Sequence, residues 1–203
     1  MTDVPPTVFL VDDDQLVLVA LKRLLRSEGY SVACYSSGEE FLRSHDPEVP
    51  GCAIIDLGLP GIDGFGIQDT LSSGLADRPL IFLTGRGDIP ASVKAMKAGA
   101  VDFLAKPPDA SSLLTAVAQA LNRDSEARQD RERRKIVEQR LSSLTPRERE
   151  VLTRVVAGRL NKQIAAELGI VEKTIKVHRG RVMGKMGVRS VADLVRLIGS
   201  REA

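Results

Sequence analysis

Three adjacent acids, Asp12, Asp13 and Asp14, follow directly after the apolar run VFLV at residues 8–11. Carboxylates this close repel one another, and a pair ~4 Å apart at an effective dielectric of ~20 costs roughly 4 kcal/mol. Either the acids are a solvated strand end, or they hold something positive. Mg²⁺ suits such a cluster, since it is usually held by one or two carboxylates and keeps waters and phosphate oxygens.

Polar side chains also follow three other short apolar runs in the first half of the chain. Asp56 follows CAII, Thr84 follows LIFL, and Lys106 follows VDFLA. Ligands of open parallel sheets bind outside the carboxyl ends of the strands, so these side chains and the acids at residues 12–14 are expected to meet at one edge. Each alone would be an ordinary polar strand end, but all of them together indicate a site.

The chemistry open to such a set is phosphoryl transfer onto a carboxylate. A bound Mg²⁺, or Mn²⁺, would offset the repulsion among the acids, and one carboxylate could then act as nucleophile and form an aspartyl phosphate. Lys106 would neutralise charge on the transferring group, and the Thr84 hydroxyl would hydrogen-bond one of its oxygens.

The elements that must position these residues alternate along the first half. Five apolar runs with β-branched residues are separated by stretches whose apolar residues have helical spacing. Strands alternating with helices indicate a parallel sheet covered on both faces. The sequence therefore predicts a doubly wound α/β domain over residues 1–122.

The stretch VDDDQ…IIDLGLPGIDG…LTGRGD…AMKAGAVDFLAKP resembles the receiver domain of bacterial two-component response regulators. The resemblance covers about residues 5–122 and implies a flavodoxin-like sheet of five parallel strands in the order 2-1-3-4-5. It makes Asp56 the phosphoacceptor. It also implies that the metal is held by Asp12, Asp13, Asp56 and the backbone carbonyl of Gly58.

The same resemblance implies roles at the other strand ends. Thr84 and Lys106 bind the phosphoryl oxygens, and Phe103 is the switch aromatic that follows Thr84 inward on activation. Asp14 is left as the spare acid, and we expect it at the surface, as the N-cap or a first-turn residue of the helix that begins near Gln15. The stretch GRGDIPASVKAMKAGAVDFL is typical of the FixJ-like subgroup.

The charge of the chain divides near residue 122. Residues 1–122 carry a net charge of −7 and residues 123–203 one of +9, which suggests nucleic acid as the partner of the basic part. Residues 123–140 are rich in charges of both signs, and pairs such as Asp124 with Arg128 at i,i+4 spacing favour a solvated helical linker. A disordered linker is the alternative.

The remainder, residues 141–203, shows the signals of a small all-α domain. Thr145 and Glu148 have the spacing of a capping box, which predicts the start of one helix. A second helix is expected to begin at Asn161, and a third to span about residues 172–186. Two short helices joined by a glycine turn predict a helix-turn-helix unit, although a plain bundle with a basic solvated face has the same spacing.

The stretch LTPREREVL…NKQIAAELGI…KTIKVHR…KMGV, over about residues 141–200, resembles the LuxR-type DNA-binding domain of the NarL/FixJ family. The family usually has Ser or Thr where Val171 stands, so the recognition helix is expected to lack its N-cap, at a cost of ~1 kcal/mol. The resemblance makes Lys176 and Val177 the base readers. It assigns the phosphate contacts to Lys162, Lys173, Thr174, His178, Arg179 and Lys185.

The leading hypothesis is a response regulator, a transcription regulator rather than an enzyme, since its receiver only promotes its own phosphoryl transfer and dephosphorylation. A histidine kinase phosphorylates Asp56, and the basic domain then binds double-stranded promoter DNA as a homodimer, with RNA polymerase as a further candidate partner. The last helix, which carries Val191, Leu194, Val195 and Ile198, either mediates that dimer or closes the bundle.

Two other functions remain open. An Asp-nucleophile phosphatase also uses Mg²⁺ on a doubly wound sheet, but its first-strand Asp-x-Asp-x-Thr/Val pattern is not matched by DDDQL. A phosphorylation-independent DNA-binding protein would leave the acid pocket without a use. The absence of a membrane-spanning run, a secretory signal or a cysteine cluster predicts a cytoplasmic protein without membrane partners.

Overall fold

The computed structural model describes residues 5–73, 78–85 and 89–199. The chain divides into two compact units, residues 1–128 and 129–203, which are described in turn. The expected domain limits at residues 122 and 141 remain predictions.

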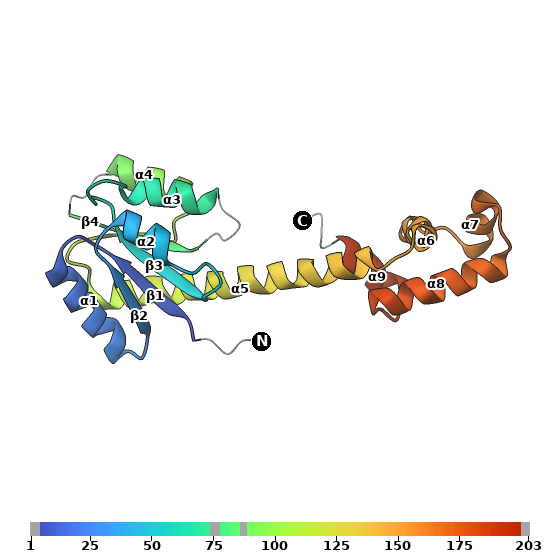
Figure 1. The fold of residues 1–203 in the computed structure, drawn as a ribbon, viewed down its shortest axis with the longest axis horizontal. Coiled ribbons are helices and arrows are strands. Elements are labelled where there is room, and N and C mark those ends of the chain that lie inside the picture. Colours follow the sequence, from blue (N-terminus) through green and yellow to red (C-terminus); the bar gives the residue numbers. More distant parts are fainter. Residues whose placement is uncertain (1–4, 74–77, 86–88, 200–203) are drawn as a thin grey trace. The chain divides into compact units, whose positions relative to one another are not determined.

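The first unit is built on a parallel sheet (Figure 1). Its strand order, β2-β1-β3-β4-β5, is the predicted order 2-1-3-4-5. The strands are β1 (Thr7–Val11), β2 (Ser31–Tyr35), β3 (Gly51–Asp56), β4 (Leu80–Thr84) and β5 (Asp102–Ala105). All six residues of β3 are buried, as expected for a central strand of a sheet covered on both faces.

Helices cover both faces of this sheet, which confirms the doubly wound α/β prediction. The helices are α1 (Gln15–Ser27), α2 (Gly38–Ser44), α3 (Gly64–Ser72), α4 (Ile89–Lys97) and the first turns of α5 (Ala110–Ser142). One core cluster joins the sheet to α1 and α5, and the other joins it to α2, α3 and α4. Two separate apolar layers therefore hold the strand ends in place.

The third acid of the opening triplet caps a helix, as predicted. Asp14 precedes α1 in extended conformation, and its side chain accepts a hydrogen bond of 2.8 Å from the N–H of Leu16. This bond satisfies one of the N–H groups that the first turn of a helix leaves without an intrahelical partner. Only Asp12 and Asp13 of the triplet remain for a site.

The charged stretch at residues 123–140 lies wholly within α5. It contains the predicted Asp124–Arg128 pair, in which Arg128 Nε lies 2.8 Å from Asp124 Oδ2. The carboxylate of that pair is shielded from solvent, because Asp124 is only 2% exposed. Among the described helices, none is long and apolar enough to cross a membrane.

The second unit is a small helical bundle that follows the predicted order of elements. Its helices are α6 (Pro146–Val156), α7 (Asn161–Leu168), α8 (Glu172–Met186) and α9 (Val191–Gly199). The capping box at Thr145 and Glu148 is present. Gly169 ends α7 in the left-handed region at φ 65°, where glycine carries no Cβ penalty.

One side of α9 packs into the core of the helical bundle. Leu194 is fully buried, and Val191 and Ile198 pack against the same cluster, so α9 closes the bundle. Val195 remains 42% exposed. A dimer contact through α9 would have to use that outer side.

Candidate functional site

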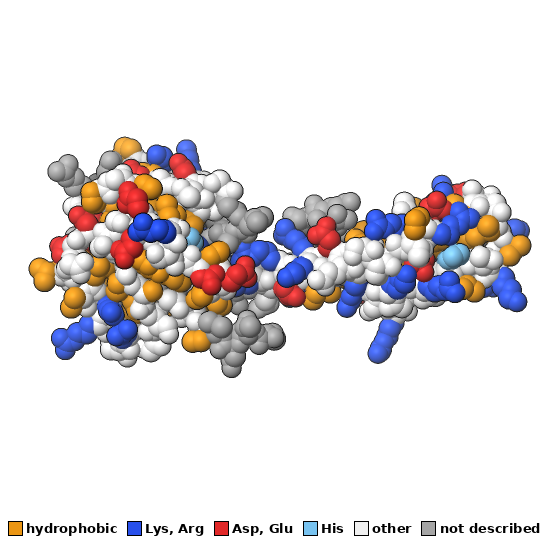
Figure 2. Space-filling view, in the orientation of Figure 1, with side chains coloured by type: hydrophobic (Ala, Val, Ile, Leu, Met, Phe, Trp, Pro, Cys, Tyr) orange, Lys and Arg blue, Asp and Glu red, His pale blue; other side chains and the backbone are white. Residues whose placement is uncertain are grey.

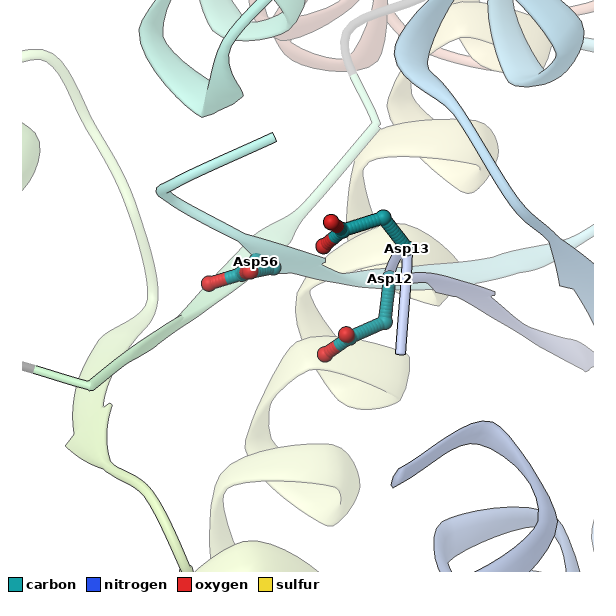
Figure 3. Close-up of side chains that lie close together, drawn as sticks. All are labelled: Asp12, Asp13 and Asp56. Carbon is teal, nitrogen blue, oxygen red and sulfur yellow. The ribbon is translucent and has the colours of Figure 1, made fainter. Parts of the chain in front are cut away.

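The two acids that follow β1 and the acid that ends β3 lie side by side at the carboxyl edge of the sheet (Figure 3). Each of Asp12, Asp13 and Asp56 offers a carboxylate oxygen, and these atoms lie within 4.8 Å of one another. Asp12 is 2% exposed and Asp56 8% exposed, whereas Asp13 is exposed to solvent. β1 and β3 are direct neighbours in the sheet, and this adjacency brings together two acids that are 44 positions apart.

Lys106 completes the cluster from the end of β5. Its Nζ lies 2.5 Å from Asp12 Oδ2 and 3.1 Å from Asp56 Oδ2. The backbone N–H of Lys106 donates to the carbonyl of Thr84, at 2.7 Å, so the ends of β4 and β5 are joined at this point. One ammonium group therefore lies between the two buried carboxylates and offsets their repulsion.

Burial and ion pairing shift the pKa values of Asp12 and Lys106 in opposite directions. Burial raises the pKa of Asp12, and its hydrogen bonds with Lys106 and the N–H of Asp14 lower it without cancelling that effect. For Lys106, burial lowers the pKa, but the hydrogen bonds to Asp12 and Asp56 outweigh burial and leave the pKa above its ordinary value. Lys106 is therefore positively charged over the whole neutral range.

The donor set fits a hard divalent cation. All three side chains present oxygen atoms, and the exposed position of Asp13 leaves the cluster open to water on one side. Gly58 lies beside the cluster, where its N–H donates to Asp56 Oδ1 at 3.3 Å. Carboxylate and backbone oxygens with room for waters are what Mg²⁺ requires.

The two residues predicted to act as a switch lie on the neighbouring strands. Thr84 ends β4 and is 6% exposed. Phe103 on β5 is half-buried, and its ring packs against the core with its centroid 6.4 Å from that of Phe82. The structure thus places both at the same end of the sheet as the acids.

In the second unit, α8 presents most of the side chains predicted to contact DNA. Lys162 on α7 and Lys173, Lys176 and Val177 on α8 are exposed, and Lys and Arg side chains gather on this unit (Figure 2). Thr174, His178 and Arg179 are half-buried. Arg179 Nη1 donates to Asn161 Oδ1 at 2.9 Å and so joins α8 to the start of α7.

Lys185 has a different environment from the other predicted phosphate contacts. Its Nζ lies 2.6 Å from Glu148 Oε2 and donates to the carbonyl of Ser143 at 2.9 Å. These two bonds hold the ammonium group against the start of α6. Although the Lys185 side chain is 35% exposed, its ammonium group is engaged by partners within the second unit, which argues against the predicted contact with a DNA phosphate.

Sequence reasoning missed a buried polar cluster at the opposite end of the sheet. Asp124 Oδ2 accepts from the N–H of Gly51 and from Arg128 Nε, both at 2.8 Å. Arg78 is 4% exposed, donates to the carbonyls of Asp46 and Val49, and stacks over Phe9 at 4.2 Å. The i,i+4 spacing on α5 was the only sequence signal for this cluster.

Both units match known families over the parts that carry these sites. Residues 8–118 match the model of the response regulator receiver domain, and residues 142–198 match that of the bacterial regulatory proteins of the luxR family. A five-stranded receiver sheet with an acid cluster, followed by a helix-turn-helix unit, defines a transcription regulator of the response regulator class.

Whole-chain relatives agree with this assignment. Nodulation protein W of Bradyrhizobium diazoefficiens is 44% identical over 94% of this chain and 84% of its own, and transcriptional regulatory protein FixJ of Azorhizobium caulinodans is 40% identical over 94% and 90%. The solved structure of the response regulator StyR has a TM-score of 0.87 and 47% identity over 96% of this chain and 98% of its own. The chain belongs to the two-component response regulators with a LuxR-type DNA-binding domain.

Proposed function

We propose that Asp56 accepts a phosphoryl group from a phosphohistidine of a cognate histidine kinase. A carboxylate oxygen of Asp56 bonds to phosphorus as the phosphorus–nitrogen bond breaks, and the imidazole leaves with the electron pair of that bond. The observation that carries this proposal is the position of the Lys106 ammonium group between Asp12 and Asp56 at the open edge of the sheet. There it neutralises charge on the transferring group.

The metal would be Mg²⁺ or Mn²⁺, held by Asp12, Asp13, Asp56 and the carbonyl of Gly58. It would supply charge stabilisation for the transferring phosphoryl oxygens. Lys106 and the hydroxyl of Thr84 would bind those oxygens. Phosphate adds negative charge and strong acceptors, which bias Thr84 and Phe103 toward an active arrangement.

The output of this switch is sequence-specific binding of promoter DNA by α8, with the protein acting as a homodimer in the cytoplasm, where that DNA lies. Lys176 and Val177 read base edges in the major groove. RNA polymerase is a further candidate partner. The phosphate contacts proposed here are Lys162, Lys173, Thr174, His178 and Arg179; Lys185 is left out because of its bond to Glu148.

The test of phosphoryl uptake is the intact mass of the protein after exposure to a small phosphodonor, with and without Mg²⁺. We expect a gain of one phosphoryl group that requires the metal and is absent from Asp56→Asn. Asp69→Asn, which changes an acid on the surface of α3, is the matched control and should take up phosphate normally. Uptake by Asp56→Asn at the wild-type level would place the acceptor elsewhere.

The same assay separates a regulator from a phosphatase. A regulator takes up one phosphoryl group and releases it slowly, whereas a phosphatase with an Asp nucleophile turns over phosphate esters continuously. Steady release of inorganic phosphate from an excess of ester would overturn the proposal. Promoter binding by the wild type that is unaffected by phosphorylation would favour a DNA-binding protein without a phosphoryl switch.

A further inference from the structure

The end of α5 and the residues just after it contribute apolar side chains to the helical bundle, and one charged residue lies among them. Val137 and Leu144 are buried, and Leu141 packs against the bundle core. Val137, Arg140 and Leu141 have the i, i+3, i+4 spacing of a single face of α5, and Leu144 lies two residues beyond the end of that helix. A long cation in the middle of such a face requires a polar partner on the bundle side.

That partner is the end of the recognition helix. Arg140 Nη1 donates to the carbonyl of Met186, the last residue of α8, at 2.8 Å. The final carbonyls of a helix lack intrahelical partners, and a cation there is also favoured by the helix dipole. Arg140 thus satisfies the C-terminus of α8 from outside that helix.

The contact is close and is reinforced by a second bond in the opposite direction. Gly187 has φ 65°, and a Cβ at this position would lie 2.9 Å from Arg140 Nη1. A side chain here would have to displace the guanidinium. Lys185 on α8 in turn donates to the carbonyl of Ser143, just beyond the end of α5. Two reciprocal hydrogen bonds therefore join these helix ends.

We propose that Arg140 is a positioning residue for DNA recognition. By holding the C-terminal end of α8, it fixes the angle at which the base-reading face of α8 enters the groove. The last turns of α5 therefore contribute to DNA recognition. Arg140 lies before residues 142–198, where the luxR-family match is found. The inference rests on the proposed function, since it takes α8 to be the DNA-reading helix.

Selective and non-selective binding should respond differently to the loss of this bond. Hydrogen bonds to base edges weaken steeply with small changes in distance and angle, so they depend on where α8 lies. Attraction to phosphates is long-ranged and tolerates small displacements. A displaced recognition helix therefore loses sequence preference before it loses affinity for DNA in general.

The test compares Arg140→Leu with Arg134→Leu in the full-length protein, on a DNA sequence selected by the wild type from a random pool and on unselected DNA. Both changes remove one positive charge from α5, but Arg134 is exposed. We expect Arg140→Leu to lower the affinity for the selected sequence about tenfold more than that for unselected DNA. Arg134→Leu should affect both DNAs alike, and the two variants should share one salt slope.

Two further measurements distinguish positioning from simple loss of folding. In the protein without DNA, the amides of Gly187 and Val188 at the end of α8 should exchange hydrogen several-fold faster in Arg140→Leu, while amides in the middle of α6 keep the wild-type rate. Arg140→Lys keeps a cationic donor and should recover part of the sequence preference.

The outcomes separate the two proposals. Equal sequence preference in Arg140→Leu and Arg134→Leu, with a wild type that is selective, would overturn the inference and leave the proposed function intact. A lower salt slope for Arg140→Leu than for Arg134→Leu would also overturn it, because it would make Arg140 a phosphate contact. A wild type that selects no DNA sequence, with or without the phosphodonor, would refute the proposed function and this role together.

Discussion

Glu148 and Lys185 form an ion pair at the edge of the helical bundle, with the buried Glu148 Oε2 2.6 Å from the Nζ of the partly exposed Lys185. Glu148 is 3% exposed, and the same oxygen accepts the N–H of Thr145 in the capping box. The hydrogen bond from Lys185 and that from Thr145 lower the pKa of Glu148 from its ordinary value of 4.5 to about 2. One carboxylate therefore caps α6 and fixes the last turn of α8.

This pair predicts a dependence of stability on pH. Because the pKa of Glu148 is lower in the folded protein than in the unfolded chain, its contribution is complete above about pH 5 and is lost as the pH falls toward 2. We expect the difference in thermal midpoint between the wild type and Glu148→Gln to shrink from pH 6 to pH 3. Glu150→Gln changes an exposed pair with Arg147 and is the control, with no such trend. A constant difference for Glu148→Gln would contradict this prediction.

The same pair separates the roles of two lysines in DNA binding. Lys185→Ala should lower the thermal stability of the bundle and leave the salt slope of DNA affinity unchanged, because its ammonium group is held by Glu148 and Ser143. Lys176 is paired only loosely with Glu172 at 3.6 Å and is exposed. Lys176→Ala should therefore relax the sequence preference at the position it reads. A salt slope reduced by about one in Lys185→Ala would restore the phosphate contact expected from the sequence.

Elements whose signals are local in sequence could be predicted. Three such signals span no more than four residues each: the run VFLV before an acid, the capping box at Thr145 and the glycine after Leu168. The limits of α8, Glu172 and Met186, also agree with the prediction. The acid cluster could also be predicted, because the carboxyl ends of parallel strands lie at the same edge of the sheet.

Contacts between distant segments could not be predicted in the same way. Asp124 accepts the N–H of Gly51 across 73 positions, and Arg140 reaches Met186 across 46. Both residues lie in a stretch whose composition is that of a solvated helix, and only tertiary packing makes Asp124 one of the buried charges. The partner of Lys185, Glu148, is also distant in sequence and lies within the bundle. From the sequence alone Lys185 is a basic residue near the end of α8, which predicts a phosphate contact.

The Asp124 cluster predicts a large effect from a small substitution. Asp124→Asn keeps the shape of the side chain but removes the negative charge that faces the largely buried Arg128 and Arg78. Breaking a buried ion pair from one side typically costs about 3–5 kcal/mol. Calorimetric unfolding of the full chain should show the transition of the first unit shifted to lower temperature. Asp130→Asn breaks the exposed pair with Arg133 and should leave that transition within about 0.5 kcal/mol of the wild type.

The exposed acid of the cluster should affect metal binding more than folding. Asp13 contributes an oxygen to the proposed metal site but is exposed at the sheet edge. Asp13→Asn should weaken Mg²⁺ binding at least tenfold, an effect of about 1.4 kcal/mol, and keep the thermal midpoint without metal within a few degrees of the wild type. Titration calorimetry with Mg²⁺ measures this, and Asp14→Asn, which keeps a helix-capping side chain, is the control. Equal Mg²⁺ affinity in Asp13→Asn and the wild type would remove Asp13 from the ligands.

The start of the recognition helix offers a stabilising substitution. Val171 is the N-cap of α8, with φ −76° and ψ 147°, and its side chain makes no capping hydrogen bond and is 68% exposed. Val171→Ser would place an oxygen where it can accept the N–H of the first turn, and little packing is lost because the valine faces solvent. We expect the second unit to gain about 1 kcal/mol, measured as a higher thermal midpoint. Thr145→Ala removes an existing cap at α6 and should shift the midpoint by a similar amount in the opposite direction. A lower midpoint for Val171→Ser would mean that the valine stabilises the turn before α8 by contacts that outweigh a cap.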